Sequence, residues 1–297
     1  MTEKLGVAVL GGDKRQIVMA HCLAEAGYPV WVWGLGDCQT ELGEAILCGS
    51  WETAVRNAEH IVLPLPASAD GVRVSCPLHD PDVFLRLTTL LDGIGGKRLF
   101  GGRLTEPIRN VADQKGVEWF DYFESEVLQL KNALPSAEGA ISVAMQELPI
   151  TLHGASAVVV GYGRIGSLLA ERLRVLGADV TVWARRTEAL TLAELHGHGA
   201  VRLICRNGKT VPQRIPHGCR VIFNTVPHRF LTREILEQLS PDCLLVDLAS
   251  APGGIDFQAA QALGMHAVWA TALPGKYAPE SAGRILAETL IGIWEDL

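Results

Sequence analysis

The sequence predicts an α/β protein built from two doubly wound domains, each with a mainly parallel sheet. Short apolar runs alternate with helical patterns along the whole chain, which is typical of parallel sheets. Most of these runs have Gly or Pro near one end, so buried strands are favoured over buried helices. With 297 residues, the chain is long enough for two domains that each bury a core.

The strand candidates divide evenly between the two halves of the chain. In the first half they lie at 6–10, 29–33, 60–64, 98–101 and 117–122. In the second half they lie at 155–160, 179–183, 220–224, 243–247 and 265–270.

Two helices are expected to cross between the halves. Ser136 is a suitable N-cap for the first, Glu138 would favour its first turn, and Pro149 would end it. The second covers 280–297, and its return to the first domain would leave a cleft between the halves. We therefore expect a first domain at 1–130, an interdomain helix at 131–150, a second domain at 151–278 and a terminal helix at 279–297.

Composition excludes several classes of protein. Hydrophobic residues make up 48% and charged residues 20%, which is globular rather than disordered. The formal net charge of -7 argues against a nucleic-acid surface. No window approaches the roughly 18 uninterrupted apolar residues of a membrane span, and the N-terminal segment lacks the pattern of a signal peptide. We expect a cytoplasmic protein.

The seven cysteines are scattered, odd in number and without CxxC spacing. They are Cys22, Cys38, Cys48, Cys76, Cys205, Cys219 and Cys243. Neither a disulfide framework nor a metal site is expected from this pattern. We interpret them as reduced, mostly buried thiols, and a catalytic thiol is left open.

The strongest local signal is a glycine-rich turn between the strand at 155–160 and a helical pattern at 165–176. In G-x-G-x-x-G, Gly161 allows the tight turn, Gly163 lets a pyrophosphate approach the backbone, and Gly166 lets the helix pack on the strand. This order predicts a Rossmann-like domain that binds a dinucleotide. The predicted contact residues are Gly161, Tyr162, Gly163, Arg164, Ile165 and Gly166.

The end of the next strand predicts which dinucleotide binds. NAD-binding domains usually place Asp or Glu there, whereas this chain has Ala184, Arg185 and Arg186. Guanidinium groups form charge-assisted, often bidentate bonds to phosphate, so the pair favours the 2′-phosphate of NADP. A pair of solvated surface arginines is the alternative.

Two later strand ends are expected to flank the nicotinamide half of the cofactor. They contribute Asn224, Thr225, Val226, Pro227, Ala249 and Ser250 as candidate cofactor contacts. Ordinary strand-end turns are the alternative interpretation for each of these residues.

The first domain carries a second, incomplete turn at 11–16, which lacks the third glycine. Its basic residues Lys14 and Arg15 could serve a second nucleotide or a carboxylate substrate. A proline-fixed loop presents Ser68 and Asp70 at the end of another strand as candidate substrate-binding residues, with an ordinary surface loop as the alternative. In the second half, Lys276 is expected in a shaped loop between the last strand and the terminal helix.

Several segments together resemble the family of dipicolinate synthase A subunits of spore-forming bacteria. They are VAVLGGDKRQ (7–16), LPLPASADG (63–71), PSAEGAI (135–141), VVVGYGRIGSLLA (158–170), FNTVP (223–227), VDLAS (246–250) and LPGKYAPESAG (273–283). The GYGRIG segment alone also resembles 2-hydroxy-acid dehydrogenases and adenosylhomocysteinases. The combination of GGDKRQ, LPLPASADG and LPGKYAPESAG is far more specific, and the resemblance runs nearly end to end.

This resemblance implies NADP-dependent oxidation of dihydrodipicolinate to dipicolinate in the mother-cell cytoplasm during sporulation. It also implies that a flavoprotein-like B subunit is the partner. A small dicarboxylate substrate needs cationic anchors, and the candidates are Lys14, Arg15, Arg103 and Lys276. Lys276 is also a candidate catalytic residue. The candidate proton acceptors are Glu138, His153 and His228, with water as a further one because the product ring is aromatic.

Two alternatives remain open at this stage. A 2-hydroxy-acid dehydrogenase usually carries an arginine after the later strand of its dinucleotide domain, where this chain has Ala249, Ser250 and Ala251. A regulatory or scaffold subunit that binds NADP would need no catalytic acid or base. A homodimer is left open, because the sequence does not determine the oligomeric state.

Overall fold

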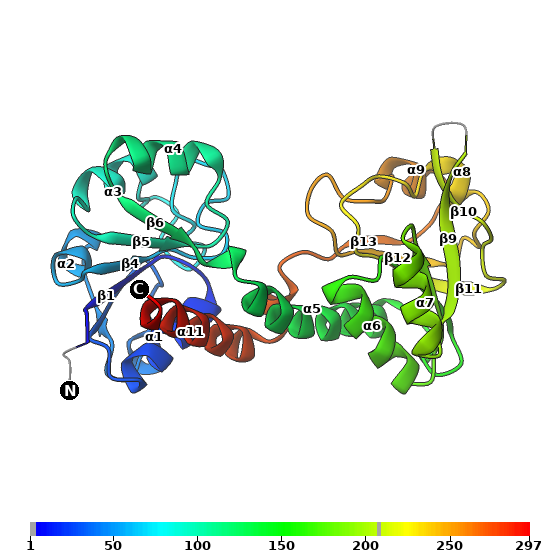
Figure 1. Cartoon of the computed structure of the whole chain (residues 1–297), viewed down its shortest axis with the longest axis horizontal. Coiled ribbons are helices and arrows are strands. Elements are labelled where there is room, and N and C mark those ends of the chain that lie inside the picture. The colour runs from blue at the N-terminus through cyan, green and yellow to red at the C-terminus, as the bar shows by residue number, and fades with distance from the viewer. Residues whose placement is uncertain (1–3, 207–208) are drawn as a thin grey trace. The chain divides into compact units, whose positions relative to one another are not determined.

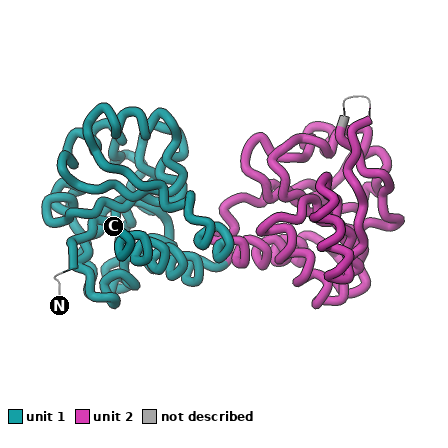
Figure 2. The backbone as a smooth tube through the Cα atoms, viewed as in Figure 1, with its two compact units in different colours: residues 1–132, 278–297 teal, residues 133–277 magenta. Residues whose placement is uncertain are grey.

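The structure is a computed structural model that describes residues 4–206 and 209–297. The first three residues of the expected 1–130 domain lie outside the described residues. The chain divides into two compact units (Figure 2). Unit 1 comprises Met1–Asn132 and Ala278–Leu297, and unit 2 comprises Ala133–Tyr277. The prediction of two doubly wound α/β domains with mainly parallel sheets is confirmed.

Unit 1 is built on a six-stranded sheet in the order β3-β2-β1-β4-β5-β6, and these strands pair in parallel. Its strands are β1 (Val7–Leu10), β2 (Val30–Trp33), β3 (Ile46–Leu47), β4 (His60–Val62), β5 (Arg98–Gly101) and β6 (Glu118–Asp121). The order reverses between β1 and β4, where the chain crosses from one half of the sheet to the other.

Helices cover both faces of this sheet (Figure 1). One core contains side chains of α1 (Lys14–Glu25) and α11 (Pro279–Glu295). The other contains side chains of α2 (Trp51–Arg56), α3 (Leu87–Gly93) and α4 (Glu106–Gln114). The terminal helix packs closely on α1, because a Cβ on Gly283 would lie 2.6 Å from the carbonyl oxygen of Arg15.

Unit 2 repeats this plan with one strand added. Its sheet has the order β10-β9-β8-β7-β11-β12-β13, and only β10 pairs antiparallel within it. The strands are β7 (Ser156–Val160), β8 (Asp179–Ala184), β9 (Gly199–Arg206), β10 (Lys209–Pro212), β11 (Cys219–Asn224), β12 (Leu244–Asp247) and β13 (Ala267–Trp269).

The helices of unit 2 also lie on both faces of its sheet. One core is formed with α5 (Glu126–Glu147), α6 (Arg164–Val175) and α7 (Thr187–Leu195). The other is formed with α8 (Arg233–Leu236) and α9 (Phe257–Ala262). The short helix α10 (Leu273–Tyr277) follows β13. No helix in the described part of the chain is long and apolar enough to cross a bilayer.

Every predicted strand is present, with ends displaced by at most two residues. Three strands were not predicted: the edge strand β3, which has only two residues, and the hairpin strands β9 and β10. In β9, buried Val201 and Leu203 alternate with exposed Arg202, which is the pattern of a strand with one exposed face.

The expected start of the interdomain helix is wrong. Helix α5 begins at Glu126, ten residues before Ser136, and contains Pro135 in its interior. Ser136 is therefore a buried residue within the helix and not its cap. The hydroxyl of Ser125 occupies the capping position instead, because it accepts the N–H of Leu128 at 3.3 Å.

The loop expected around Lys276 is also wrong. Residues 273–277 form α10, in which the N–H of Lys276 donates to the carbonyl of Ala272 at 3.2 Å. Ala272 itself has a φ of 56°. A non-glycine residue in this left-handed region is strained, and such residues cluster at functional sites.

Candidate dinucleotide site

Two glycines of the turn after β7 are required by packing. Gly161 has a φ of 88°, and its N–H donates to the carbonyl of Trp183 at 2.8 Å. A Cβ on Gly166 would lie only 2.2 Å from the carbonyl oxygen of Gly161. Helix α6 can therefore approach the strand this closely only because residue 166 lacks a side chain.

Gly163 differs from Gly161 and Gly166 because nothing in the fold requires it to be glycine. Its φ of −97° is open to any residue, and a Cβ there would meet no atom within 4 Å. It is the N-cap of α6 and offers no side-chain cap, so no side chain of the capping residue covers the start of the helix. This is a cradle that a pyrophosphate fits and that a side chain would fill.

Tyr162 anchors the turn. Its side chain is 7% exposed, and its hydroxyl lies 2.8 Å from Nδ1 of His196, at the end of α7. Burial raises the pKa of Tyr162, so the phenol stays protonated. The predicted contact of Tyr162 with a cofactor is therefore limited to its main chain.

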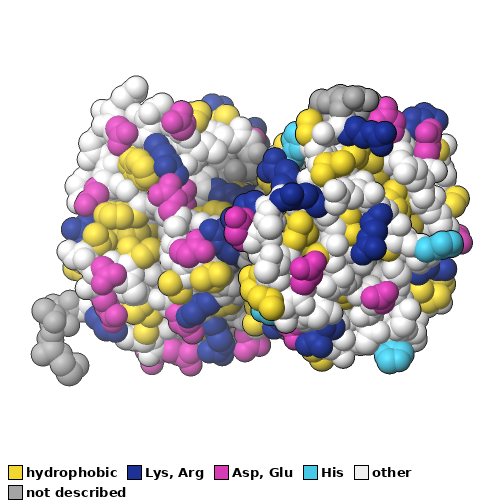
Figure 3. All heavy atoms as spheres, turned by 45° about the vertical axis from the view of Figure 1, so that its right-hand side comes forward, with side chains coloured by type: hydrophobic (Ala, Val, Ile, Leu, Met, Phe, Trp, Pro, Cys, Tyr) yellow, Lys and Arg dark blue, Asp and Glu magenta, His cyan; other side chains and the backbone are white. Residues whose placement is uncertain are grey.

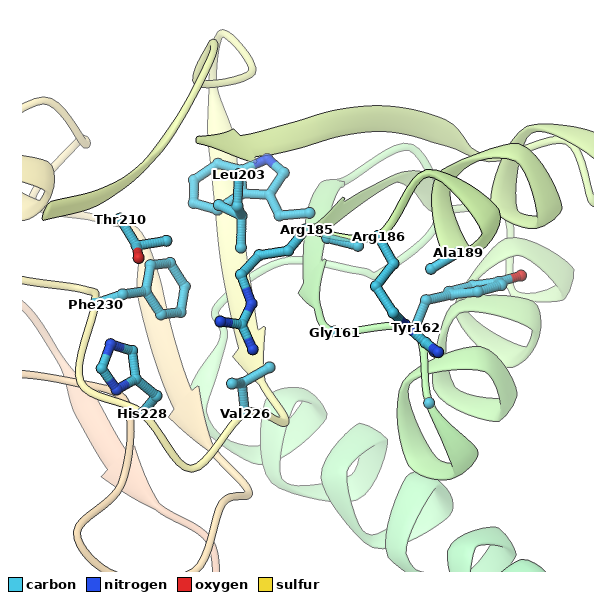
Figure 4. A pocket seen from close by; sticks show the side chains of 13 residues that line it. Gly161, Tyr162, Arg185, Arg186, Ala189, Leu203, Thr210, Val226, His228 and Phe230 are labelled. Atoms are coloured by element: carbon cyan, nitrogen blue, oxygen red, sulfur yellow. The ribbon is translucent and has the colours of Figure 1, made fainter. Parts of the chain in front are cut away.

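A pocket of about 160 Å³ adjoins the glycine turn (Figure 4). Its residues are Gly161, Tyr162, Gly163, Trp183, Ala184, Arg185, Arg186, Ala189, Leu203, Thr210, Val226, His228 and Phe230. Apolar walls from Leu203 and Phe230 beside two arginines suit a purine next to a phosphate. Leu203, Thr210 and Phe230 were not predicted as site residues. Leu203 and Thr210 lie on the β9–β10 hairpin, which was itself not predicted.

Arg185 and Arg186 lie where the sequence places them, directly after β8, and both are exposed. Neither is paired with a carboxylate in the described ranges 4–206 and 209–297. On the face of unit 2 seen in Figure 3, Lys and Arg side chains gather near the β9–β10 hairpin. The local charge is therefore positive although the whole chain is acidic.

The predicted cofactor contacts Asn224 and Thr225 are internal braces. Asn224 is fully buried, and its Nδ2 donates to Oδ1 of Asp247 at 2.7 Å. The hydroxyl of Thr225 donates to the carbonyl of Val160 at 2.7 Å. Of this loop, half-buried Val226 lines the pocket and Pro227 is exposed, so these two remain available for contact.

Asp247 is the residue that organises both later loops, and sequence reasoning did not single it out. Its carboxylate is fully buried at the end of β12 and accepts bonds from Asn224 and from the N–H groups of Ala249, Gly254 and Ile255. Burying a carboxylate away from water is unfavourable, and the hydrogen bonds from these neutral donors offset that penalty. An aspartate ending an apolar strand was the available signal.

The loop after β12 presents one exposed candidate. Ala249 is buried, and its carbonyl accepts the indole N–H of Trp269 at 2.9 Å. Ser250 is exposed, and its carbonyl accepts the N–H of Gly253 at 2.9 Å. Ser250 thus lies at the surface of the loop, whereas Ala249 shapes the loop.

The corresponding turn of unit 1 is closed by its own side chains. Asp13 caps α1 by accepting the N–H of Arg15 at 3.0 Å, and Gln16 accepts the N–H of Asp13 at 2.9 Å. The N–H of Gly12 donates to the carbonyl of Ser75 at 2.8 Å. A carboxylate already occupies this helix start, which argues against a second nucleotide there.

Burial determines the chemistry of the thiol beside this closed turn. Burial raises the pKa of Cys76 to about 11, so its thiol is protonated near neutral pH and is a poor nucleophile. A Cβ on Gly11 would lie 2.6 Å from its sulfur, so this thiol fills the turn.

Arg15 does not meet the expectation of a substrate anchor. Its side chain is 8% exposed, pairs with Asp13 at 2.9 Å and donates to the carbonyl of Leu65 at 2.6 Å. Its donors are committed to the fold of unit 1. Lys14, in contrast, is exposed at the start of α1.

The loop after β4 uses its polar groups internally. Ser68 accepts the N–H of Gly71 at 2.9 Å and donates to Asp70 at 3.1 Å. Hydrogen bonds from the N–H groups of Arg73 and Val72 hold the pKa of Asp70 below its ordinary value. Ser68 and Asp70 therefore build a turn, and no observation directs them toward a substrate.

Arg103 follows β5 in a strained conformation. Its φ is 56°, its N–H donates to Asp121 at 2.9 Å, and its guanidinium lies 4.7 Å from the ring centre of Phe123. Asp121 also pairs with Arg109 at 2.8 Å, which holds the loop in place. Arg103 and the residue preceding α10, Ala272, are the non-glycine residues with positive φ in the described structure.

The predicted proton acceptors do not gather at the glycine turn. Glu138 is exposed within α5 and pairs with Arg172, in the last turn of α6, at 3.5 Å. Since a helix rises about 1.5 Å per residue, this pair lies roughly 13 Å along α6 from Gly163. His153 precedes β7, at the opposite edge of the sheet. His228 lines the pocket that contains the arginines.

The fold and the glycine turn define a class of protein. Residues 127–279 match the family described as Alanine dehydrogenase/PNT, C-terminal domain, so unit 2 is a nicotinamide-nucleotide domain of the dehydrogenase type. Residues 6–123 match the family of N-terminal domains of the dipicolinate synthase A subunit. The chain belongs to the family of dipicolinate synthase A subunits.

Individual relatives agree with this membership over almost their whole lengths. The chain is 31% identical over 290 residues to the dipicolinate synthase A subunit of Bacillus subtilis (strain 168), covering 98% of this chain and 96% of that protein. The crystal structure of the dipicolinate synthase A subunit from Bacillus halodurans matches with a TM-score of 0.84 and 26% identity, covering 98% of each chain. The crystal structure of the Bacillus subtilis protein matches with a TM-score of 0.83 and 30% identity, covering 100% of this chain and 97% of that one.

Proposed function

We propose that this chain oxidises dihydrodipicolinate to dipicolinate with NADP, as the A subunit of a dipicolinate synthase. The observation that carries the proposal is the open, uncapped start of α6 at Gly163, beside a pocket that ends in Arg185 and Arg186. Membership of the dipicolinate synthase family supplies the substrate class. The proposal includes the setting implied by the resemblance, sporulation and the mother-cell cytoplasm.

Unit 2 would hold the cofactor with groups that are already placed. The N–H groups at the start of α6 would bind the pyrophosphate, and Arg185 and Arg186 the 2′-phosphate. When bound, NADP supplies the hydride acceptor. Val226, Pro227 and Ser250 present surfaces at the later strand ends, on loops braced by Asp247.

The substrate is a dianion, so its carboxylates need cations. In unit 1, Lys14 and Arg103 follow β1 and β5 at the carboxyl edge of one sheet. In unit 2, Lys276 is exposed on α10, after strained Ala272. We propose these three cations as carboxylate anchors, and we no longer include Arg15, whose charge is paired within the fold.

The reaction removes one hydride and one proton from the substrate ring, and aromatisation drives it. We no longer propose Glu138, which pairs with Arg172 far along α6, as the proton acceptor. His228 lies in the pocket of Arg185 and Arg186, so we reassign it to the adenosine end. Positioning and anion binding, with water as proton acceptor, suffice for this chemistry.

A turnover assay tests the proposal. Purified chain would receive NADP and freshly generated dihydrodipicolinate, with and without the B subunit, while NADPH absorbance is followed. We expect NADPH to form in the presence of the substrate. Formation with this chain alone would make it the catalytic subunit, and formation only with the partner would make the complex the active unit. No formation in either case contradicts the proposal.

A binding experiment tests the choice of cofactor without turnover. Replacing Arg185 and Arg186 together with glutamine should weaken NADP binding roughly 100-fold, because both positive charges beside the 2′-phosphate are lost. NAD binding should change little, since NAD lacks that phosphate. Titration calorimetry with both dinucleotides measures the two affinities. Equal losses for both would show that the arginines do not read the 2′-phosphate.

A further inference from the structure

We propose that Arg202, on strand β9, is a third cation of the 2′-phosphate site and a determinant of NADP specificity. This inference rests on the proposed function, because it extends the phosphate site assigned there to Arg185 and Arg186. Arg202 belongs neither to the glycine turn nor to the arginine pair that follows β8. Neither of these sequence motifs therefore predicts that Arg202 contributes to phosphate binding.

The sheet brings Arg202 to the correct strand end. Strand β9 runs parallel to β8, and Arg202 is the register partner of Ala184, the last residue of β8. Register partners on neighbouring strands project from the same face of a sheet. Ala184 belongs to the core that packs under α7, so Arg202 projects toward α7.

A hydrogen bond connects Arg202 to the residue that follows Arg186. Nη2 of Arg202 donates to the hydroxyl oxygen of Thr187, the first residue of α7. A guanidinium has five N–H donors, so most of those of Arg202 stay available. The threonine hydroxyl, which accepts from Arg202, keeps its own proton to donate to a phosphate oxygen.

The charge of this cluster is not compensated by the protein. Arg186 and Arg202 are exposed, and neither pairs with a carboxylate among the residues that the structure describes. Glu188 is the acidic residue of the first turn of α7, yet it forms no ion pair with them in those residues. Other surface arginines, such as Arg174 and Arg233, do pair with nearby glutamates.

The side chains of Arg185 and Arg186 point in different directions, which leaves room for a third cation. Figure 4 shows the guanidinium of Arg185 extending toward Val226, whereas that of Arg186 extends toward Tyr162. The two arginines therefore do not form one clamp. Arg202, which reaches Thr187 beside Arg186, supplies a second guanidinium on the Arg186 side. A phosphate monoester carries about −1.5 to −2 charges at pH 7, so it can be bound by more than one cation together with a hydroxyl.

Two fragments of the cofactor isolate the phosphate in question. Adenosine 2′,5′-bisphosphate and 5′-AMP would be titrated into the full chain by calorimetry, so that neither nicotinamide nor turnover contributes. Arg202→Gln should weaken the bisphosphate about tenfold, because one charge-assisted contact is lost. It should change 5′-AMP affinity less than about twofold, and Arg202→Lys should recover part of the loss.

Arg206→Gln is the matched control, because it removes the same charge from another exposed position of the same strand. We expect it to affect both fragments equally and weakly. Equal weakening of both fragments by Arg202→Gln, or no weakening at all, overturns the inference. If Arg185 and Arg186 control the preference for bisphosphate while Arg202 does not, the NADP proposal stands and this inference fails. If the unaltered chain does not prefer the bisphosphate, the NADP proposal itself fails.

Discussion

The two units share a strand order but differ at the place where a phosphate would bind. In unit 1, Asp13 caps α1 and the carbonyl of Ser75 accepts the N–H of Gly12, so the helix start is occupied. In unit 2, Gly163 caps α6 without a side chain, and the space above it is open. The same fold therefore gives one closed turn and one site ready for an anion, and the capping residue decides between them.

The arginines beside the closed turn and beside the open turn also differ in the way they are used. The arginine of the closed turn, Arg15, is buried and paired with Asp13, so it stabilises the fold. The arginines beside the open turn are exposed and directed into a pocket. An arginine after a parallel strand thus serves structure or binding according to whether a carboxylate lies within reach.

The largest effect should come from filling the open turn. Gly163→Val should lower NADP affinity about a thousandfold, because the side chain would occupy the space of the pyrophosphate. The thermal unfolding midpoint should stay near that of the unaltered chain, since a Cβ there meets nothing within 4 Å. Calorimetric titration and thermal unfolding measure the two quantities.

Gly49→Val is the control for this experiment, because Gly49 also faces open space but lies in unit 1. It should leave NADP affinity unchanged. Gly166→Ala should act differently and destabilise unit 2, because its Cβ would collide with the carbonyl of Gly161. Retained NADP affinity in Gly163→Val would contradict the assignment of the turn.

The next largest effect should come from opening the closed turn. Asp13→Ala should lower the free energy of unfolding by roughly 2–3 kcal/mol, because it removes a helix cap and the partner of a buried arginine. Chemical denaturation measures this loss. Thr105→Ala is the control, because Thr105 is the N-cap of α4 and its side chain makes no capping bond.

The Asp13→Ala substitution also tests whether the Asp13 cap alone closes the turn of unit 1 to a phosphate. In a Gly163→Val background, Asp13→Ala should create no NADP site, because the segment containing Ser75 and Cys76 still covers the turn. Detectable NADP binding by that double variant would show that the carboxylate was the only obstacle.

The smallest effect concerns stability in acid. His60 in unit 1 is 3% exposed and packs against Phe100 and Trp294. Burial lowers the pKa of His60 below its ordinary value of 6.5, so below that pH the unfolded chain binds a proton that the folded chain excludes. Stability should therefore fall as the pH decreases from 6.5 toward the folded-state pKa. Above 6.5 this group should contribute no pH dependence.

Denaturation midpoints measured between pH 7 and pH 5 check this prediction. His60→Leu should reduce the slope of stability against pH, whatever it does to stability at pH 7. His198 in unit 2 is also buried, with its pKa lowered by burial, but Glu171 lies 4.0 Å from its Nε2 and partly offsets that effect. His198→Leu should therefore reduce the slope less than His60→Leu. The reverse order would contradict this comparison.

Much of the fold could be predicted because its signals are local. Apolar runs ending in Gly or Pro located ten of the strands, including the edge strands β6 and β13, and most of these strands are buried on both faces. The missed strands have a weaker pattern. Strand β3 has only two residues, β9 alternates buried and exposed residues, and β10 is an antiparallel strand at the edge of its sheet. The start of α5 was missed because Pro135 reads as a boundary, although the helix continues through it.

Site residues whose role depends on backbone conformation could be predicted from the sequence. Which side chains are occupied by hydrogen bonds or ion pairs to other residues could not. The glycines of the turn and the arginines after β8 were identified by spacing alone. Asn224 and Arg15 looked equally functional, but Asn224 binds Asp247, 23 residues away, and Arg15 binds the carbonyl of Leu65, 50 residues away, as well as nearby Asp13. Arg202 was not considered, because its relation to Thr187 depends on the pairing of β8 with β9.

By itself, the sequence determined two parallel-sheet domains, a glycine turn without a capping side chain and a pair of arginines after the next strand. These properties depend on residues within a few positions of one another, where φ preference, burial and charge act directly. Only the tertiary structure decided which polar groups are free to bind, because a hydrogen bond or an ion pair to a distant segment removes a side chain from that role. Asp13 and Gly163 illustrate both points, since each is a local choice whose consequence depends on what covers the turn.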